Sequence, residues 1–231
     1  MVAVLSHIVA KRFKEKTGID VIGLPSFECL DTPVDSHADM LLSVIDNNIF
    51  VYKEYYESNK DLFHSLSEKY KIINVEKPCQ RHYPEDIALN VLVIGKKIFC
   101  KIKSVAAEIL NYAQENGYKL INISQGYSAC STLVINENVA ITGDKGVYNA
   151  LVNEGIKTLL ISNDDIRLDG YNSGFIGGAC GVYDKKVFVF GEIEKLSSHQ
   201  SFLDFIKAEN CTLFEVLTGD VCDFGGIKLL N

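Results

Sequence analysis

The sequence predicts an α/β protein built as a five-bladed α/β propeller, a ring of five strand-strand-helix-strand units. A hairpin followed by an amphipathic helix and a further strand recurs along the 231 residues. Equivalent hairpin positions fall 41–49 residues apart, an interval typical of repeats whose units cannot bury their apolar faces alone. The aligned positions are Ile45, Ile94, Ile135, Tyr183 and Leu230.

The N-terminal segment predicts a helix and a strand. Ile8, Val9 and Phe13 fall on one side of a helix over residues 6–17, and lysines and a glutamate occupy the other. Gly18 ends this helix, and the strand that follows ends at Pro25. The chain stops after one strand of its fifth unit, so residues 1–25 are expected to complete the unit begun at 219–231, within a single domain of residues 1–231.

The first two complete units each predict a hairpin, a helix and a closing strand. In the first, the hairpin has an Asn47-Asn48 turn. In the second, Asn116-Gly117 is a helix C-cap signal because glycine accepts positive φ. The first unit places these elements at 41–51, 55–70 and 71–75, and the second places them at 91–100, 104–115 and 119–123.

The third and fourth units repeat the pattern, and the fifth begins it. Asp144 is a good N-cap for the third helix, which Gly155 ends. The predicted elements are a hairpin at 132–142, a helix at 144–154 and a strand at 157–162, then a hairpin at 182–190, a helix at 198–209 and a strand at 212–217, and finally a strand at 227–230. Propeller blades made of four strands share this period but contain no helix, whereas these units have one each.

Composition excludes several classes of function. The net charge of −7 leaves no basic stripe for a nucleic acid and is compatible with a cationic ligand. No apolar run is long enough for a membrane helix, and the N-terminus does not resemble a signal peptide. The seven scattered cysteines form no Cys-x-x-Cys pair, so we expect neither a zinc site nor any other metal, and a reducing cytoplasm is favoured. No phosphate-binding glycine motif is present, so no cofactor is expected.

Three short stretches carry recognisable local motifs, and they are His37-Ala38-Asp39-Met40, Ala140-Ile141-Thr142-Gly143-Asp144 and Phe175-Ile176-Gly177-Gly178. Together they resemble the pentein superfamily of guanidino-group-modifying enzymes, which includes arginine and agmatine deiminases, dimethylarginine hydrolases and amidinotransferases. The first stretch is similar to that family's His-x-Asp stretch, and the second is similar to its strand-to-helix junction. As period and pattern, the resemblance covers the whole chain. It implies the ring-shaped fold and a small guanidino or amidino substrate.

The resemblance also implies a mechanism, from which this chain departs in two places. In the enzymes a cysteine near the C-terminus attacks the guanidinium carbon, a histidine moves protons, and carboxylates hold the guanidinium nitrogens. Here Gly225-Gly226 is followed by no cysteine, and the His-x-Asp stretch lies in the first complete unit rather than just upstream of the cysteine-bearing one. The superfamily also has a non-catalytic branch of ribosomal anti-association factors, so the fold alone does not imply an enzyme.

The residues that precede each hairpin should converge on the axis of the ring. The hairpin alignment places His37, Asp86, Tyr127, Phe175 and Cys222 at equivalent positions. Because units five and one would be neighbours, we expect Cys222 as a nucleophile beside His37 as general acid and base.

Carboxylates that bind a cation complete the predicted site, and they are Asp39, Glu85, Asp86 and Asp223. Structural interpretations stay open beside this site: Cys222 as an ordinary small residue near a turn, His37-Ala38-Asp39 as a turn that caps a strand, and Glu85-Asp86 as a solvated loop. Cys130 and Cys180 are predicted core residues, and the two Gly-Gly pairs are predicted to permit close backbone approach.

Three hypotheses remain open from the sequence. The first is a Cys–His hydrolase or transferase acting on a guanidino or amidino compound. The second is a non-catalytic protein of the same fold that binds a small cation or a macromolecule. The third is a doubly wound α/β domain, in which the repeat interpretation is wrong. The oligomeric state is left open.

Overall fold

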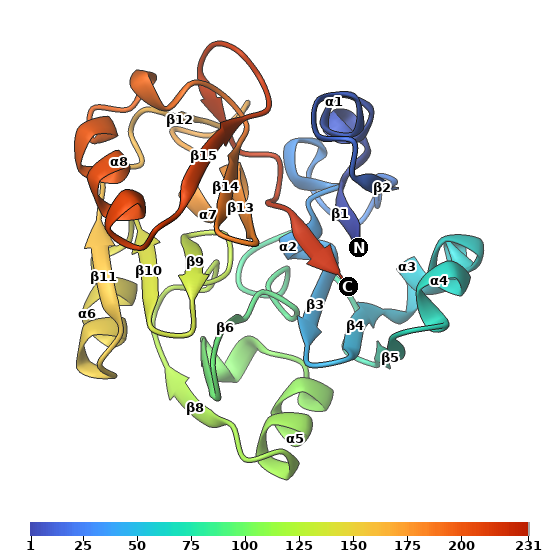
Figure 1. Ribbon diagram of the computed structural model, residues 1–231. Coiled ribbons are helices and arrows are strands. Elements are labelled where there is room, and N and C mark those ends of the chain that lie inside the picture. Colours follow the sequence, from blue (N-terminus) through green and yellow to red (C-terminus); the bar gives the residue numbers. More distant parts are fainter. Residues whose placement is uncertain (231) are drawn as a thin grey trace.

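Five three-stranded sheets form most of the computed structural model, which describes residues 1–230 (Figure 1). The expected mixed α/β class is confirmed. The sheets are β3 (Leu42–Ile45), β4 (Asn48–Tyr52) and β5 (Lys71–Val75); β6 (Leu92–Ile94), β7 (Lys97–Cys100) and β8 (Lys119–Asn122); β9 (Thr132–Asn136), β10 (Val139–Thr142) and β11 (Lys157–Leu160); β13 (Cys180–Tyr183), β14 (Lys186–Val189) and β15 (Thr212–Glu215); and β17 (Lys228–Leu230), β1 (Val2–Ser6) and β2 (Asp20–Leu24).

All five sheets have the same strand pairing. The first strand pairs antiparallel with the second, and the third pairs parallel with the second. A parallel neighbour requires a crossover, which a helix supplies in every case. In the last sheet, β17 comes from the end of the chain and β1 from its beginning, so the two termini lie close together (Figure 1).

The crossover helices lie on the outer side of the strands (Figure 1). Their ends follow the expected capping chemistry: Gly18 adopts φ +71° after the first helix, and the Asp144 carboxylate accepts the Val147 N–H. The helices are α1 (His7–Thr17), α3 (Lys53–Ser58), α4 (Lys60–Ser67), α5 (Ala107–Glu115), α6 (Lys145–Asn153) and α8 (His199–Ala208).

Several local features differ from the expectation. The helix predicted over 55–70 is broken at Asn59 into α3 and α4, and the first hairpin turns at Asp46 and Asn47, one residue early. Asp46 takes φ +51° in this turn. The sequence pattern did not predict the strand pair β12 (Ile166–Arg167) with β16 (Val221–Cys222), the short helices α2 (Ala38–Leu41) and α7 (Ile176–Ala179), and the 3₁₀ turns at Thr32–Val34, Ile102–Ser104 and Ile193–Lys195.

The apolar faces of the units pack against their neighbours. Phe13 of α1 contacts Phe188 and Phe190, with ring centroids 5.5 and 6.4 Å apart, and so joins the N-terminal segment to β14 and the residue that follows it. Between residues 1 and 230, no helix is both long and apolar enough to cross a membrane.

Candidate functional site

A closed circuit of hydrogen bonds joins the loops that lead into the five hairpins. The Asn90 amide donates to the Asp39 carbonyl (2.9 Å), and the Asp39 N–H donates to the Gly225 carbonyl (3.1 Å). The neighbouring Phe224 N–H donates to the Gly178 carbonyl, and the Gly178 N–H donates to the Cys130 carbonyl. The Ala129 N–H donates to the side-chain oxygen of Asn90 at 2.8 Å, which closes the circuit. The circuit fixes the positions of five loops around one centre.

A cavity of about 260 Å³ opens beside this circuit, and we call it the axial cavity. Aromatic and apolar side chains form most of its wall, with an imidazole, a thiol and a carboxylate among them. It is lined by Val34, His37, Met40, Tyr127, Cys130, Leu168, Tyr171, Asn172, Ser173, Phe175 and Asp223.

His37 lies against Asp223 in this cavity. It directly precedes α2, and its Nδ1 lies 3.7 Å from Asp223 Oδ1. Gly225 passes so close that a Cβ there would lie 2.3 Å from the His37 Cα, which confirms the expected backbone approach at this Gly-Gly pair. Burial lowers the pKa of His37, and the charges of Asp39 and Asp35 oppose this only in part. The imidazole is therefore mainly neutral at neutral pH.

Asp223 is a buried carboxylate held by backbone donors. Its oxygens accept the N–H groups of Phe175 (2.8 Å) and Gly225 (2.9 Å). Burial raises its pKa to about 6 even though both hydrogen bonds favour the charged form. Asp223 therefore titrates close to neutral pH.

Asp39 is buried without a hydrogen-bond donor in good geometry for either oxygen. The Cys130 thiol lies beside its side chain. Burial raises the pKa of Asp39, and the nearby Asp223 adds to the rise, whereas His37 and Lys228 oppose it. An ionised carboxylate is costly at a buried position without a donor in good geometry, so the protein alone favours the neutral form of Asp39.

Asp86 is a third buried carboxylate, and it is joined to the cavity wall by a hydrogen bond from Tyr127. The Tyr127 hydroxyl donates to Asp86 Oδ2 at 2.7 Å, and Oδ1 has no partner. Burial raises the pKa of Asp86, and the charge of the half-buried Glu85 contributes. The Tyr127 ring lies 6.1 Å from the Phe175 ring in the cavity wall. The predicted axial positions of Asp86, Tyr127 and Phe175 thus lie in one cluster.

Cys130 is the thiol of the axial cavity. The Asn90 amide donates to its Sγ at 2.8 Å. Burial, with the charges of Asp39 and Asp223, raises the pKa of Cys130 well above its usual value. The sequence pattern assigned Cys130 to the core. The one sequence signal is its position three residues after Tyr127, which the hairpin alignment places at the axis.

Cys222 lies on the other side of a shared wall. It lines a second cavity with Ile8 and Pro33, and among residues 1–230 only Leu168 and Asp223 border both this cavity and the axial one. Successive side chains of an extended segment point to opposite faces, and in this segment the Asp223 side chain is the one that lies against His37. Burial raises the pKa of Cys222, with Arg167 opposing the shift. The pairing of Cys222 with His37 stays a prediction.

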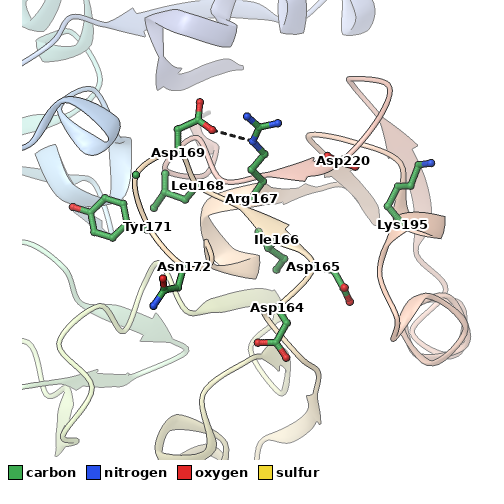
Figure 2. A pocket seen from close by; sticks show the side chains of 11 residues that line it. Asp164, Asp165, Ile166, Arg167, Leu168, Asp169, Tyr171, Asn172, Lys195 and Asp220 are labelled. Atoms are coloured by element: carbon green, nitrogen blue, oxygen red, sulfur yellow. Dashed lines mark hydrogen bonds and ion pairs between the residues drawn. The ribbon is translucent and has the colours of Figure 1, made fainter.

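A segment between β11 and α7 bounds the axial cavity on one side. Leu168, Tyr171 and Asn172 line both the axial cavity and an outer, acid-rich cavity of about 470 Å³ (Figure 2). On the outer side Arg167 Nε donates to Asp169 at 2.9 Å (Figure 2). In the described chain no group of three or more His, Cys, Asp or Glu is placed to hold a metal ion.

One family model covers most of the chain. Residues 6–228 match the model of a family of unknown function, DUF6873. No curated protein matches.

Three solved structures are similar in fold to 94% of this chain. A dimethylarginine dimethylaminohydrolase from Pseudomonas aeruginosa is 8% identical, with a TM-score of 0.58 over 91% of its length. A saxitoxin-pathway amidinotransferase from Microseira wollei is 15% identical, with 0.59 over 76% of its length. A C. jejuni agmatine deiminase is 10% identical, with 0.55 over 86% of its length.

Proposed function

The chain belongs to the DUF6873 family and is a divergent member with the pentein fold, and from these premises we propose that its axial cavity binds a small planar organic cation of the guanidino or amidino type. The cavity is lined by the Asp223 carboxylate and by aromatic faces, and the Asp39 carboxylate lies close enough behind this wall to act on Asp223 and His37 by its charge. The similar solved structures include enzymes that act on guanidino or amidino groups, and the shared fold supports a ligand of this class.

The observation that carries the proposal is the unpartnered carboxylate of Asp39 next to Asp223. The two residues are 3% and 4% exposed, and within residues 1–230 neither forms an ion pair with a lysine or arginine. Two neighbouring buried carboxylates repel each other and are poorly solvated, so a bound cation would relieve both costs. A guanidinium or amidinium group also has several N–H donors in one plane, which carboxylates accept in pairs.

The aromatic side chains fit the flat faces of such a cation. Tyr127, Tyr171 and Phe175 line the cavity, and rings attract a cation placed over their faces. The Tyr127 hydroxyl is already committed to Asp86, so this ring is held in place. The cavity volume suits a small head group, not a bulky one.

A thermal-shift panel tests the ligand class. Arginine, agmatine and methylated arginines carry the cation, whereas citrulline replaces it with a neutral group of similar shape. We expect a concentration-dependent rise in melting temperature with one or more of the cations and none with citrulline.

Asp39→Asn should abolish the shift, and Asp204→Asn, at an exposed helix position, should preserve it. No shift with any cation, or an equal shift with citrulline, would contradict the proposal.

A second candidate function is covalent turnover of the bound cation, favoured because the Cys130 thiol, His37 and Asp223 line one cavity. The Cys130 thiolate would form a C–S bond to the guanidinium carbon after passing its proton to His37. His37 would return that proton to the leaving amine as the C–N bond breaks, and water would then cleave the C–S bond to give a urea-type product and the free thiol. A cation against Asp39 and Asp223 would lower the raised pKa of the thiol.

Product analysis with two cysteine variants tests this second function. Cys130→Ala should abolish release of amine or ammonia, and Cys222→Ala should retain it. The reverse result would support the nucleophile predicted from the sequence, Cys222 with His37. If the wild-type protein releases no product from any cation that it binds, covalent turnover is contradicted and the protein is a binding module.

We also propose that the five sheets form a closed five-bladed α/β propeller around the axial cavity. The shared strand pairing, the β17–β1 contact and the closed hydrogen-bond circuit support this arrangement. An experimental structure should superpose the five sheets by equal successive rotations about one axis. Unequal rotations or a gap between two sheets would contradict it.

A cytoplasmic location is part of the same proposal. All seven cysteines are unpaired, which suits a reducing compartment. Cell fractionation would test it, and recovery of the protein in an oxidising compartment would contradict it.

A further inference from the structure

Two cysteines that are 50 positions apart meet at one edge of the molecule. The Cys29 thiol donates to the Cys79 carbonyl at 2.9 Å, and the proximity of Cys29 contributes, after burial, to the raised pKa of the Cys79 thiol. Cys29 is half-buried and Cys79 is buried. Neither residue lines the axial cavity, so the proposed function does not use this pair.

Other contacts hold the two loops together around the cysteines. Arg81 Nη2 donates to the Glu28 carbonyl at 3.1 Å, and Arg81 Nε lies 3.5 Å from an Asp31 oxygen. The Tyr55 hydroxyl donates to the Pro25 carbonyl at 2.9 Å and fixes the start of the first loop. The reduced protein therefore already holds together the two loops that carry these cysteines, which favours a bond between their thiols.

Both loops lead to the axial site. The first loop continues through Val34, which lines the axial cavity, to His37. The second carries Asp86, and the Tyr52 hydroxyl donates to the Asp86 carbonyl at 3.1 Å. The Tyr52 side chain also contacts the Cys79 thiol. A covalent link between Cys29 and Cys79 would therefore tie a segment that lines the cavity, through Val34 and His37, to one whose Asp86 accepts a hydrogen bond from the lining residue Tyr127.

We infer that Cys29 and Cys79 form a redox-sensitive dithiol that a small disulfide oxidant, such as oxidised glutathione, converts to an intramolecular disulfide. The more accessible Cys29, as thiolate, attacks one sulfur of the oxidant, and one glutathione leaves as its thiol. Cys79 then loses its proton and attacks the Cys29 sulfur of the mixed disulfide, which releases the second glutathione. Two electrons and two protons pass from the protein thiols to the oxidant.

Burial makes the second step slow. It raises the pKa of Cys79, so the thiolate required for that attack is scarce at neutral pH. The mixed disulfide at Cys29 should therefore appear first, and the intramolecular bond should replace it faster at higher pH.

Mass spectrometry of the full chain tests the inference. The protein is incubated with oxidised glutathione at about pH 8, free thiols are blocked with N-ethylmaleimide, and digested peptides are mapped. We expect a linked peptide pair containing Cys29 and Cys79, with loss of two hydrogens, reversed by dithiothreitol. The oxidised protein should melt about 5–10 °C higher, because the link closes a long loop in the unfolded chain.

Variants make the test specific. Cys29→Ser should form no link, and Cys211→Ser, which removes another half-buried thiol, should form it as the wild type does. A glutathione adduct that persists on Cys29, or a disulfide that joins other cysteines, would overturn the inference. The readout is a mass, so this result does not depend on whether the axial cavity binds a cation.

Discussion

Asp39 is the residue at which stability and the proposed function oppose each other. A buried carboxylate with no partner lowers the stability of the unliganded protein whenever it is ionised. The fold does not need this cost. An energetic cost that a bound ligand would relieve is typical of binding sites.

The substitution Asp39→Asn should change stability in a pH-dependent way. The pKa of Asp39 is raised in the folded protein, so its stabilising contribution is present at low pH and is lost as pH rises through the folded pKa. The asparagine does not ionise. The free energy of unfolding of the variant relative to wild type should therefore increase from pH 5 to pH 8, by about 1.4 kcal/mol for each unit by which the folded-state pKa of Asp39 exceeds 5. Urea denaturation at both pH values measures it.

Asp223→Asn offers a comparison for this prediction. Asp223 accepts two backbone N–H groups, and an amide oxygen keeps only part of that capacity. Asp223→Asn should have a lower free energy of unfolding than the wild type at pH 5, whereas Asp39→Asn should not be destabilised at that pH. An Asp39→Asn variant that is destabilised equally at every pH would show that its ionisation carries no strain.

At the scale of elements, the loop before β17 positions His37. Gly225 has φ +79°, and its missing side chain leaves room for the His37 backbone and ring. A methyl group there would force the loop of α2 and the loop before β17 apart.

Gly225→Ala should disturb the site far more than Gly219→Ala. Gly219 has a similar φ of +87°, but nothing lies within 4 Å of its added Cβ. Both variants carry a backbone cost of about 1–2 kcal/mol, and only Gly225→Ala adds a steric clash. We expect a clear further loss of unfolding free energy and loss of the cation-induced thermal shift in Gly225→Ala alone. Equal behaviour of the two variants would show that this close approach does not position His37.

The sequence pattern was most informative where an element has several turns or an alternating face. The hairpins and the long helices satisfy this condition, and Asp144 and Gly18 mark helix ends by local chemistry. The four-residue helices α2 and α7 and the two-residue pair of β12 with β16 are too short to show a period. Their formation depends on contacts between loops that are far apart in sequence.

The site shows the same division. The hairpin alignment brought His37, Asp86, Tyr127 and Phe175 to a common region, but a one-residue difference in register decides whether Cys222 or Asp223 faces His37. Cys130 could not be distinguished from a core cysteine, because its place beside Asp39 depends on the Asn90 hydrogen bonds that join different units.

At the scale of the whole molecule, the hydrogen-bond circuit explains how weakly related loops build one site. Each unit contributes a backbone or amide group to the next, and the carboxylates of Asp39 and Asp223 are thereby fixed beside each other. Cation binding should therefore depend on the contacts among all five loops and on the ionisation of the carboxylates between them.

Titration calorimetry with the cation that gives the largest thermal shift tests the central claim most directly. The pKa of Asp223 is about 6, so the carboxylate is mostly ionised at about pH 7.5 and mostly protonated at about pH 5. We predict affinity at least about tenfold weaker at the lower pH, and about thirtyfold weaker in Asp39→Asn at the higher pH. Affinity that is independent of pH and of Asp39 would contradict a cation held by the axial carboxylates.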